Sequence, residues 1–96
     1  MSNGRMVKKY EMHHGTATVE YSSISGYAYF PDHLSPNPDE LGVVIDARER
    51  GRAKLDTLIH ELLHLEHPKM SEAEVARTAT NITNVLWGEG YRERTK

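Results

Sequence analysis

Residues 55–64 read LDTLIHELLH, and this stretch decides how the rest of the chain is interpreted. Its leucine and isoleucine residues recur at helical spacing, which predicts an amphipathic helix from about residue 51 to residue 66 or 67. On a helical wheel the apolar residues cover one broad arc. His60, Glu61 and His64 lie together on a separate polar arc, so the helix is predicted to carry two different faces.

The polar arc contains the pattern H-E-x-x-H. Because residues i and i+4 lie one turn apart on the same face of a helix, His60 and His64 can bind one Zn²⁺ at about 2.0–2.1 Å. Glu61 points toward the same site, where it can accept a proton from a water molecule activated by the metal. The alternative is a solvated polar face that carries two histidines by chance, and the broad apolar arc behind it favours the metal site.

A catalytic zinc site needs a third protein ligand. The chain has no cysteine, and no aspartate follows His64. Ser71 and Glu74 match a capping box, which predicts a second helix that ends near Gly88. Glu72 falls inside the apolar stripe of that helix, where a carboxylate needs a partner such as a metal ion, so it is the predicted third ligand. The predicted stripe consists of Val75, Ala79, Ile82 and Leu86.

His67 is the alternative third ligand. Residues i and i+7 lie about 10 Å apart along a helix, so His67 could join His60 only if Pro68 bent the backbone. Glu72 also has a purely structural explanation, because the helix dipole favours acidic residues in the first turn. The remaining histidines, His13, His14 and His33, are expected to be solvated turn or loop residues.

The amino-terminal half of the chain carries β-type signals interrupted by turns. Strands are predicted at residues 16–21, 26–30 and 41–47, with a proline-rich loop at residues 30–40. Residues 41–47 are expected to form an exposed sheet edge above the cleft, where an extended peptide could pair with them. The predicted fold is therefore α+β: a small antiparallel or mixed sheet followed by the two helices. It forms a single domain over residues 1–96, with frayed ends at residues 1–5 and 92–96.

Composition excludes several classes of protein. With 96 residues and no cysteine, the chain is one small domain without disulfides or cysteine-based zinc sites. A net charge of −2 gives no reason to expect nucleic acid or an anionic membrane as a partner. No apolar run approaches the roughly 18 residues of a membrane-spanning helix, and no signal peptide is visible. A cytoplasmic location is therefore expected.

Three segments resemble small zincin-like proteins that are common in bacteriophage and some bacterial genomes. They are residues 55–64, the sequence SEAEV at 71–75, and LW-x-x-GYR at 86–92. The resemblance covers about residues 41–92. The order of its motifs is similar to that of gluzincins, including the minigluzincins and the ImmA/IrrE-like peptidases. It implies a minimal zincin-like fold and a glutamate on the following helix as third ligand, which is Glu72 in this chain. Larger gluzincins have a supporting Asp or Asn where this chain has Ala76, so the resemblance implies that this support is either altered or supplied from elsewhere, such as Asp46.

The leading hypothesis is a zinc-dependent metallopeptidase that hydrolyses a peptide or protein substrate. Its Zn²⁺ would be held by His60, His64 and Glu72, with Glu61 as general base. His67 and Tyr91 are candidates for stabilising the oxyanion. A latent form with the carboxy-terminal tail in the cleft is also considered.

Two alternatives belong to other classes. One is a zinc-binding protein of the same fold without activity, in which Glu61 would be superfluous. The other is a helix-turn-helix DNA-binding protein. The second predicted helix would then need several basic residues, but it has only Arg77, which argues against this class.

Overall fold

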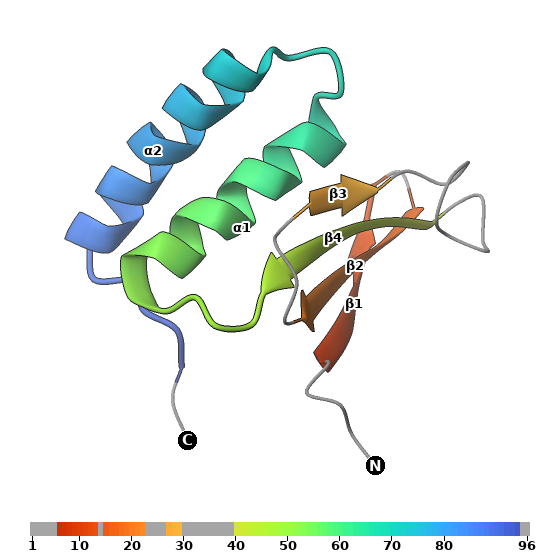
Figure 1. Ribbon diagram of the computed structural model, residues 1–96, viewed down its shortest axis with the longest axis horizontal. Helices are drawn as coiled ribbons and strands as arrows, with labels where there is room; N and C mark the ends of the chain where they lie inside the picture. The colour runs from red at the N-terminus through yellow and green to blue at the C-terminus, as the bar shows by residue number, and fades with distance from the viewer. Residues whose placement is uncertain (1–5, 14, 23–26, 30–39, 95–96) are drawn as a thin grey trace.

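The computed structural model describes residues 6–13, 15–22, 27–29 and 40–94. It has four strands followed by two helices (Figure 1), which confirms the expected α+β class. The predictions for His14, for His33 and for most of the proline-rich loop lie outside the described residues. The elements are β1 (Met6–Met12), β2 (Gly15–Ser22), β3 (Tyr27–Tyr29), β4 (Glu40–Asp46), α1 (Gly51–Glu66) and α2 (Glu72–Gly88).

The four strands form one mixed sheet in the order β1-β2-β4-β3. Strands β1 and β2 pair antiparallel, β2 and β4 pair parallel with Val19 opposite Val43, and β3 pairs antiparallel with β4. Three predicted strands are found within one or two residues of their expected bounds. The strand β1 was not separately predicted, because the sequence showed only a general β-type character there.

Strand β4 lies inside the sheet, so the prediction that residues 41–47 form an exposed edge is wrong. Val43, Val44 and Ile45 are consecutive and at most 1% exposed, so the strand is covered on both faces. Such a continuous apolar run is typical of an interior strand, whereas a half-exposed strand alternates. Among the described strands, the edge on this side of the sheet is β3.

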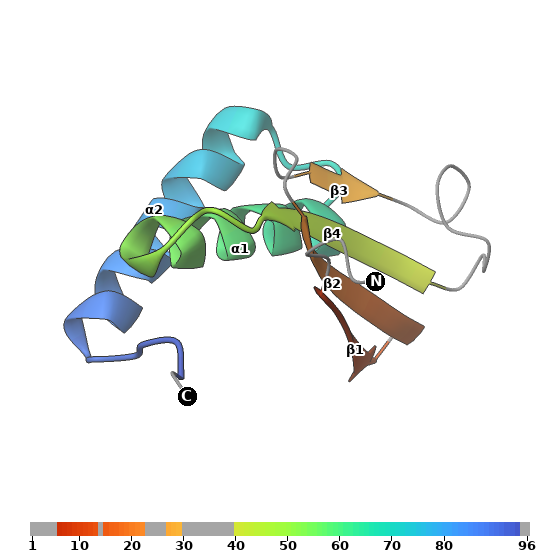
Figure 2. The same cartoon turned by 60° about the horizontal axis from the view of Figure 1, so that its bottom comes forward.

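Helix α1 covers one face of the sheet and supplies the centre of the core (Figure 2). The buried cluster joins Val19 of β2 and Ile45 of β4 to Leu65 of α1, with Leu58 and Leu62 packed against it. These leucines belong to the apolar arc predicted from the sequence. The opposite arc of α1 is therefore left free to carry polar groups.

Helix α2 packs on α1 rather than on the sheet, so the molecule is a stack of sheet, α1 and α2 (Figure 1). The two helices run side by side in opposite directions as a helical hairpin. Val75 and Ala79 are buried as predicted, but Ile82 is 38% exposed and Thr83 is fully buried in its place. Helix α2 contacts only one neighbouring helix among the described elements, so its buried surface is narrow. It consists of three residues spaced four apart, Val75, Ala79 and Thr83.

The ends of both helices follow from local sequence. Helix α1 begins at Gly51, whose φ of +61° favours glycine, and its regular part ends before Pro68. Helix α2 begins after Ser71 with the predicted capping box. No helix in the described part of the chain is both long and apolar enough to cross a bilayer.

Candidate metal centre

Two histidines of α1 project together toward the start of α2. His60 and His64 lie one helical turn apart, and their ring centroids are 5.0 Å apart. They are partly buried, with side chains 21% and 26% exposed. The predicted H-E-x-x-H arc is thus a real face of α1 that is directed away from the core leucines.

Glu72 places its carboxylate between the two imidazoles. Its Oε2 lies 3.0 Å from Nε2 of His60, and its Oε1 lies 2.8 Å from Nε2 of His64. These donor atoms all lie within 4.8 Å of one another, and they form the potential metal-binding group among the described residues. The structure therefore brings together the three residues that the sequence singled out as ligands.

The position of Glu72 depends on the way α2 begins. Ser71 Oγ accepts a hydrogen bond from the backbone N–H of Glu74 at 3.1 Å, and Glu74 Oε1 accepts one from the N–H of Ser71 at 3.1 Å. This reciprocal pair fixes the first turn of α2 and sets the direction of the Glu72 side chain. Glu74 is therefore occupied in capping, as the sequence indicated.

The environment predicted for Glu72 is wrong, although its place on the helix is right. Its side chain is 72% exposed, so it is not a buried carboxylate that requires a partner. Glu72 is the first residue of α2, and the row of α2 residues that contacts α1 is exposed to solvent at this end. The site is therefore open on one side, as a catalytic metal site that keeps a free position must be.

The donor set fits a zinc ion. Two imidazole nitrogens and one carboxylate are ligands that Zn²⁺ takes in catalytic sites. Ligands of a tetrahedral zinc at about 2.0–2.1 Å lie about 3.3 Å from one another. The distances of 2.8 and 3.0 Å from Glu72 to the two histidines are those of hydrogen bonds, so the side chains would have to shift to bind an ion in their place.

Glu61 lies beside the histidines and is more shielded than Glu72. Burial raises the pKa of the Glu61 carboxyl, and positive charge on His60 and His64 opposes this rise. The carboxylates of Glu72 and Glu49 add to the increase. Such an environment gives a carboxylate greater basicity than it has in water.

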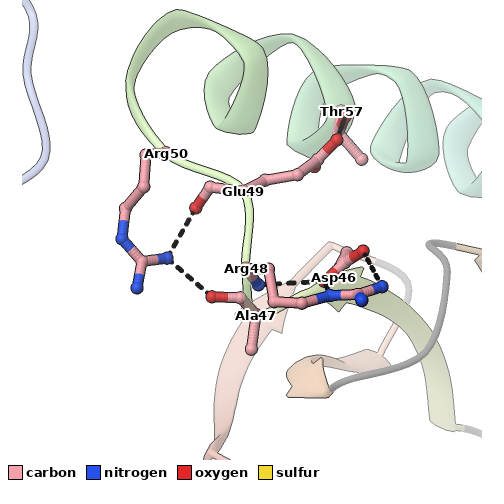
Figure 3. A network of polar contacts seen from close by, with 6 residues as sticks. All are labelled: Asp46, Ala47, Arg48, Glu49, Arg50 and Thr57. Carbon is pink, nitrogen blue, oxygen red and sulfur yellow. Dashed lines mark hydrogen bonds and ion pairs between the residues drawn. The ribbon is translucent and has the colours of Figure 1, made fainter.

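Glu49 is a residue of this region that the sequence did not single out. It lies in the loop before α1, and its Oε2 accepts a hydrogen bond from Thr57 Oγ1 at 3.0 Å (Figure 3). Thr57 precedes Glu61 by one turn, so the Glu49 carboxylate lies along the polar face of α1. Its Oε1 is buried without a hydrogen-bond partner among the described residues. No spacing rule would have found it, because it reaches the helix from a loop.

Asp46 does not support a ligand, contrary to the suggestion from sequence. Its Oδ1 accepts hydrogen bonds at 2.9 Å from the backbone N–H and Nε of Arg48, and its Oδ2 accepts one from Nη2 at 2.8 Å (Figure 3). Asp46 therefore closes the turn that follows β4. Arg50 holds the same loop through hydrogen bonds to the carbonyls of Ala47 and Glu49.

His67 and Tyr91, the two candidates for oxyanion stabilisation, lie at opposite ends of α1. His67 is the exposed residue that ends α1, with non-helical φ and ψ of −135° and 70°, and it lies outside the metal-binding group of the described residues. Tyr91 lies beside Gly51 and Lys54, at the amino-terminal end of α1. Glu93 forms an ion pair with Lys54 at 2.6 Å, so this part of the tail lies at the same end of α1, away from the histidines.

Comparisons of the chain with protein-family models, with curated proteins and with solved structures found no match.

Proposed function

We propose that this protein is a zinc-dependent metallopeptidase of gluzincin type, in which His60, His64 and Glu72 hold the metal and Glu61 is the general base. The observation that carries the proposal is the convergence of the three donor groups from two helices, within 4.8 Å of one another. The motif alone provides two histidines on one helix. The third donor comes from a different element, whose start is fixed by its own capping box.

A zinc ion in this site supplies Lewis acidity, which polarises a peptide carbonyl and lowers the pKa of a water molecule. The residues of the chain do the rest. Glu61 accepts the proton of the attacking water and passes it to the amine leaving group. Its raised pKa suits this role, because a general base works best when its pKa approaches the working pH.

The presence of Glu61 favours an enzyme over a purely structural zinc site. A metal ion that only joined α1 to α2 would need its three ligands. It would not need the partly buried carboxylate of Glu61 beside them. Burial disfavours the charged form of Glu61, so the residue is held in a costly environment. A catalytic role explains that cost.

The substrate is expected to be an extended peptide segment. Strand β3 lies against α1 and pairs on one side with β4. Its other edge is the one on which an incoming peptide could add a strand, close to the active-site helix. Helix α2 carries Arg77 as its single basic residue, so it gives no support to DNA binding.

The direct test is hydrolysis of an unfolded protein by the zinc-loaded chain, compared with Glu61→Gln. Gln cannot act as a base at neutral pH and has nearly the size of Glu, so zinc binding should persist while hydrolysis falls by at least about 100-fold. Glu66→Gln, an exposed residue at the end of the same helix, is the matched control and should keep full activity. Zinc content by atomic absorption shows that the variants carry metal.

Wild-type activity in Glu61→Gln would exclude Glu61 as the base. If the wild-type protein binds zinc and hydrolyses no peptide, the inactive zinc-binding alternative replaces the peptidase.

A further inference from the structure

A second cavity lies at the end of α1 that is distant from the metal-binding group. It has a volume of about 550 Å³, within the usual range for a small-molecule site. Its walls come from the first half of α1, from the end of α2 and the tail after it, and from one edge of the sheet. We call it the basic pocket, because of the side chains described next.

Positive charge is concentrated around this cavity. Its walls contain four basic side chains, those of Lys8, Arg50, Lys54 and Arg92, and one carboxylate, that of Glu93. The chain as a whole has a net charge of −2, so this excess is local. Helix α1 also begins here and has no acidic residue in its first turn, which leaves the positive end of its dipole uncompensated.

Glu93 shows how the basic side chains of this pocket interact with a carboxylate. Its Oε2 lies 2.6 Å from Nζ of Lys54, whose side chain is 17% exposed and lies over the ring of Tyr21 at 4.6 Å. The hydrogen bond from Lys54 lowers the pKa of Glu93, and the charges of Arg50 and Lys8 lower it further. One carboxylate thus lies in the field of three cations, which leaves positive charge for a second.

The remaining walls are apolar and aromatic. Leu55 and Leu58 of α1 form one side, and Trp87 of α2 forms another. The Trp87 ring carries the Arg92 guanidinium on its face at 3.5 Å from the centroid. Arg92 thus covers one face of Trp87, and a flat or aliphatic group could lie against the leucines and the uncovered part of the indole while its charged end meets the cations.

We infer that the basic pocket binds a small organic carboxylate with an aromatic or aliphatic body. Charge favours an anion, the walls favour an apolar group beside it, and Glu93 already shows that a carboxylate is accepted there. The inference does not rest on the metal centre, because it uses neither the histidines nor Glu72.

The chain offers its own probe, because Trp87 is the only tryptophan and it lines the pocket. Titration with 4-phenylbutyrate, followed by Trp87 fluorescence in EDTA and again with zinc, should give the same saturable one-to-one binding. The uncharged 4-phenylbutyramide should bind at least about tenfold more weakly, because it lacks the charge-assisted hydrogen bonds. Inorganic phosphate should also bind more weakly, since it has no apolar body.

Neighbouring residues of β1 provide a matched pair of variants. Lys8 is paired with Val19 and lies on the α1 side of the sheet, whereas Lys9 is paired with Thr18 and faces the other side. Both are exposed, so neither substitution should prevent folding. Lys8→Gln should weaken phenylbutyrate binding about two- to fivefold, as loss of an exposed charge partner does, and Lys9→Gln should leave it unchanged.

Glu93→Gln tests whether the tail competes with the ligand. Removal of its charge frees Lys54 and should tighten phenylbutyrate binding about threefold or more. Equal binding of the acid and the amide would overturn the inference, as would equal effects of the Lys8 and Lys9 substitutions. Failure of both wild type and Glu93→Gln to bind any of the probes would also overturn it, whatever the outcome for zinc.

Discussion

Asp46 shows how a single charged side chain stabilises the turn that leads from β4 into α1. Hydrogen bonds from the side chain and backbone of Arg48 lower the pKa of Asp46 from 3.8 to about 2. A carboxyl whose pKa is lower in the folded state stabilises the fold above its unfolded pKa. That contribution is lost as the pH falls through the folded value.

We therefore expect Asp46→Asn to be less stable than wild type at pH 5 and above, because the ionised contact with Arg48 is missing. The difference should shrink below pH 3.8 and vanish only below pH 2, once Asp46 is protonated in both the unfolded and the folded state. Urea unfolding in EDTA at a series of pH values measures it. A difference that stays constant across this range would show that the Asp46 charge has no role.

Glu72 illustrates what a helical wheel can and cannot establish. The wheel placed it on the face that meets α1, and the structure agrees, because its oxygens lie within 3.0 Å of both histidines. The prediction that the Glu72 side chain is buried was wrong, because its exposure depends on where the contact between the two helices ends. That endpoint is a property of tertiary packing and is not encoded in the spacing of apolar residues.

The first turn of α2 is the element that directs Glu72, and its stability should be measurable. Ser71→Ala removes the oxygen that accepts the Glu74 N–H, so we expect a loss of about 0.5–2 kcal/mol in the free energy of unfolding. Asn81→Ala, at an exposed position in the middle of α2, should cause no loss. Urea unfolding of the metal-free proteins tests both, and a loss as large in Asn81→Ala would count against the cap.

The interface between α1 and α2 contains a poorly satisfied polar group. Thr83 is fully buried, and its Oγ1 has no hydrogen-bond partner among the described residues. Thr83→Val replaces this hydroxyl with a methyl group of similar size, so we expect a gain of about 1–2 kcal/mol in unfolding free energy. Thr80→Val, on the exposed side of α2, loses only the long 3.4 Å contact with Asp56 and should change stability by less than about 0.5 kcal/mol. Loss of stability in Thr83→Val would mean that the hydroxyl is hydrogen-bonded.

Elements whose signals are local were well predicted, and those that depend on distant partners were not. The bounds of α1 and α2 follow from apolar period, the proline after α1 and the capping box before α2. The sheet order β1-β2-β4-β3 places β3 outside β4, although β3 comes earlier in the chain. Because strand pairing joins residues far apart in sequence, the strand order could not be predicted, although the continuous apolar run of Val43, Val44 and Ile45 was a local sign of an interior strand.

The whole molecule is a stack in which α1 is shared by two interfaces. Its apolar arc packs on the sheet, and its other side meets α2 through a small buried row that includes Val75 and Ala79. Polar contacts supplement this second interface, such as the one between Thr80 and Asp56 at 3.4 Å. A zinc ion bound to both helices would add a strong link where the apolar contact is modest.

Zinc titration of the purified chain and its variants tests the central claim most directly. We expect one Zn²⁺ per chain, with affinity reduced at least about 100-fold in Glu72→Ala, because loss of a ligand should cost no less than loss of an outer-sphere partner. Glu74→Ala, two residues away, keeps all three ligands and should weaken zinc binding far less than Glu72→Ala, while it loses some helix stability. His67→Ala should bind zinc normally. Wild-type affinity in Glu72→Ala, together with loss of binding in His67→Ala, would exclude Glu72 as a ligand and indicate a site of three histidines.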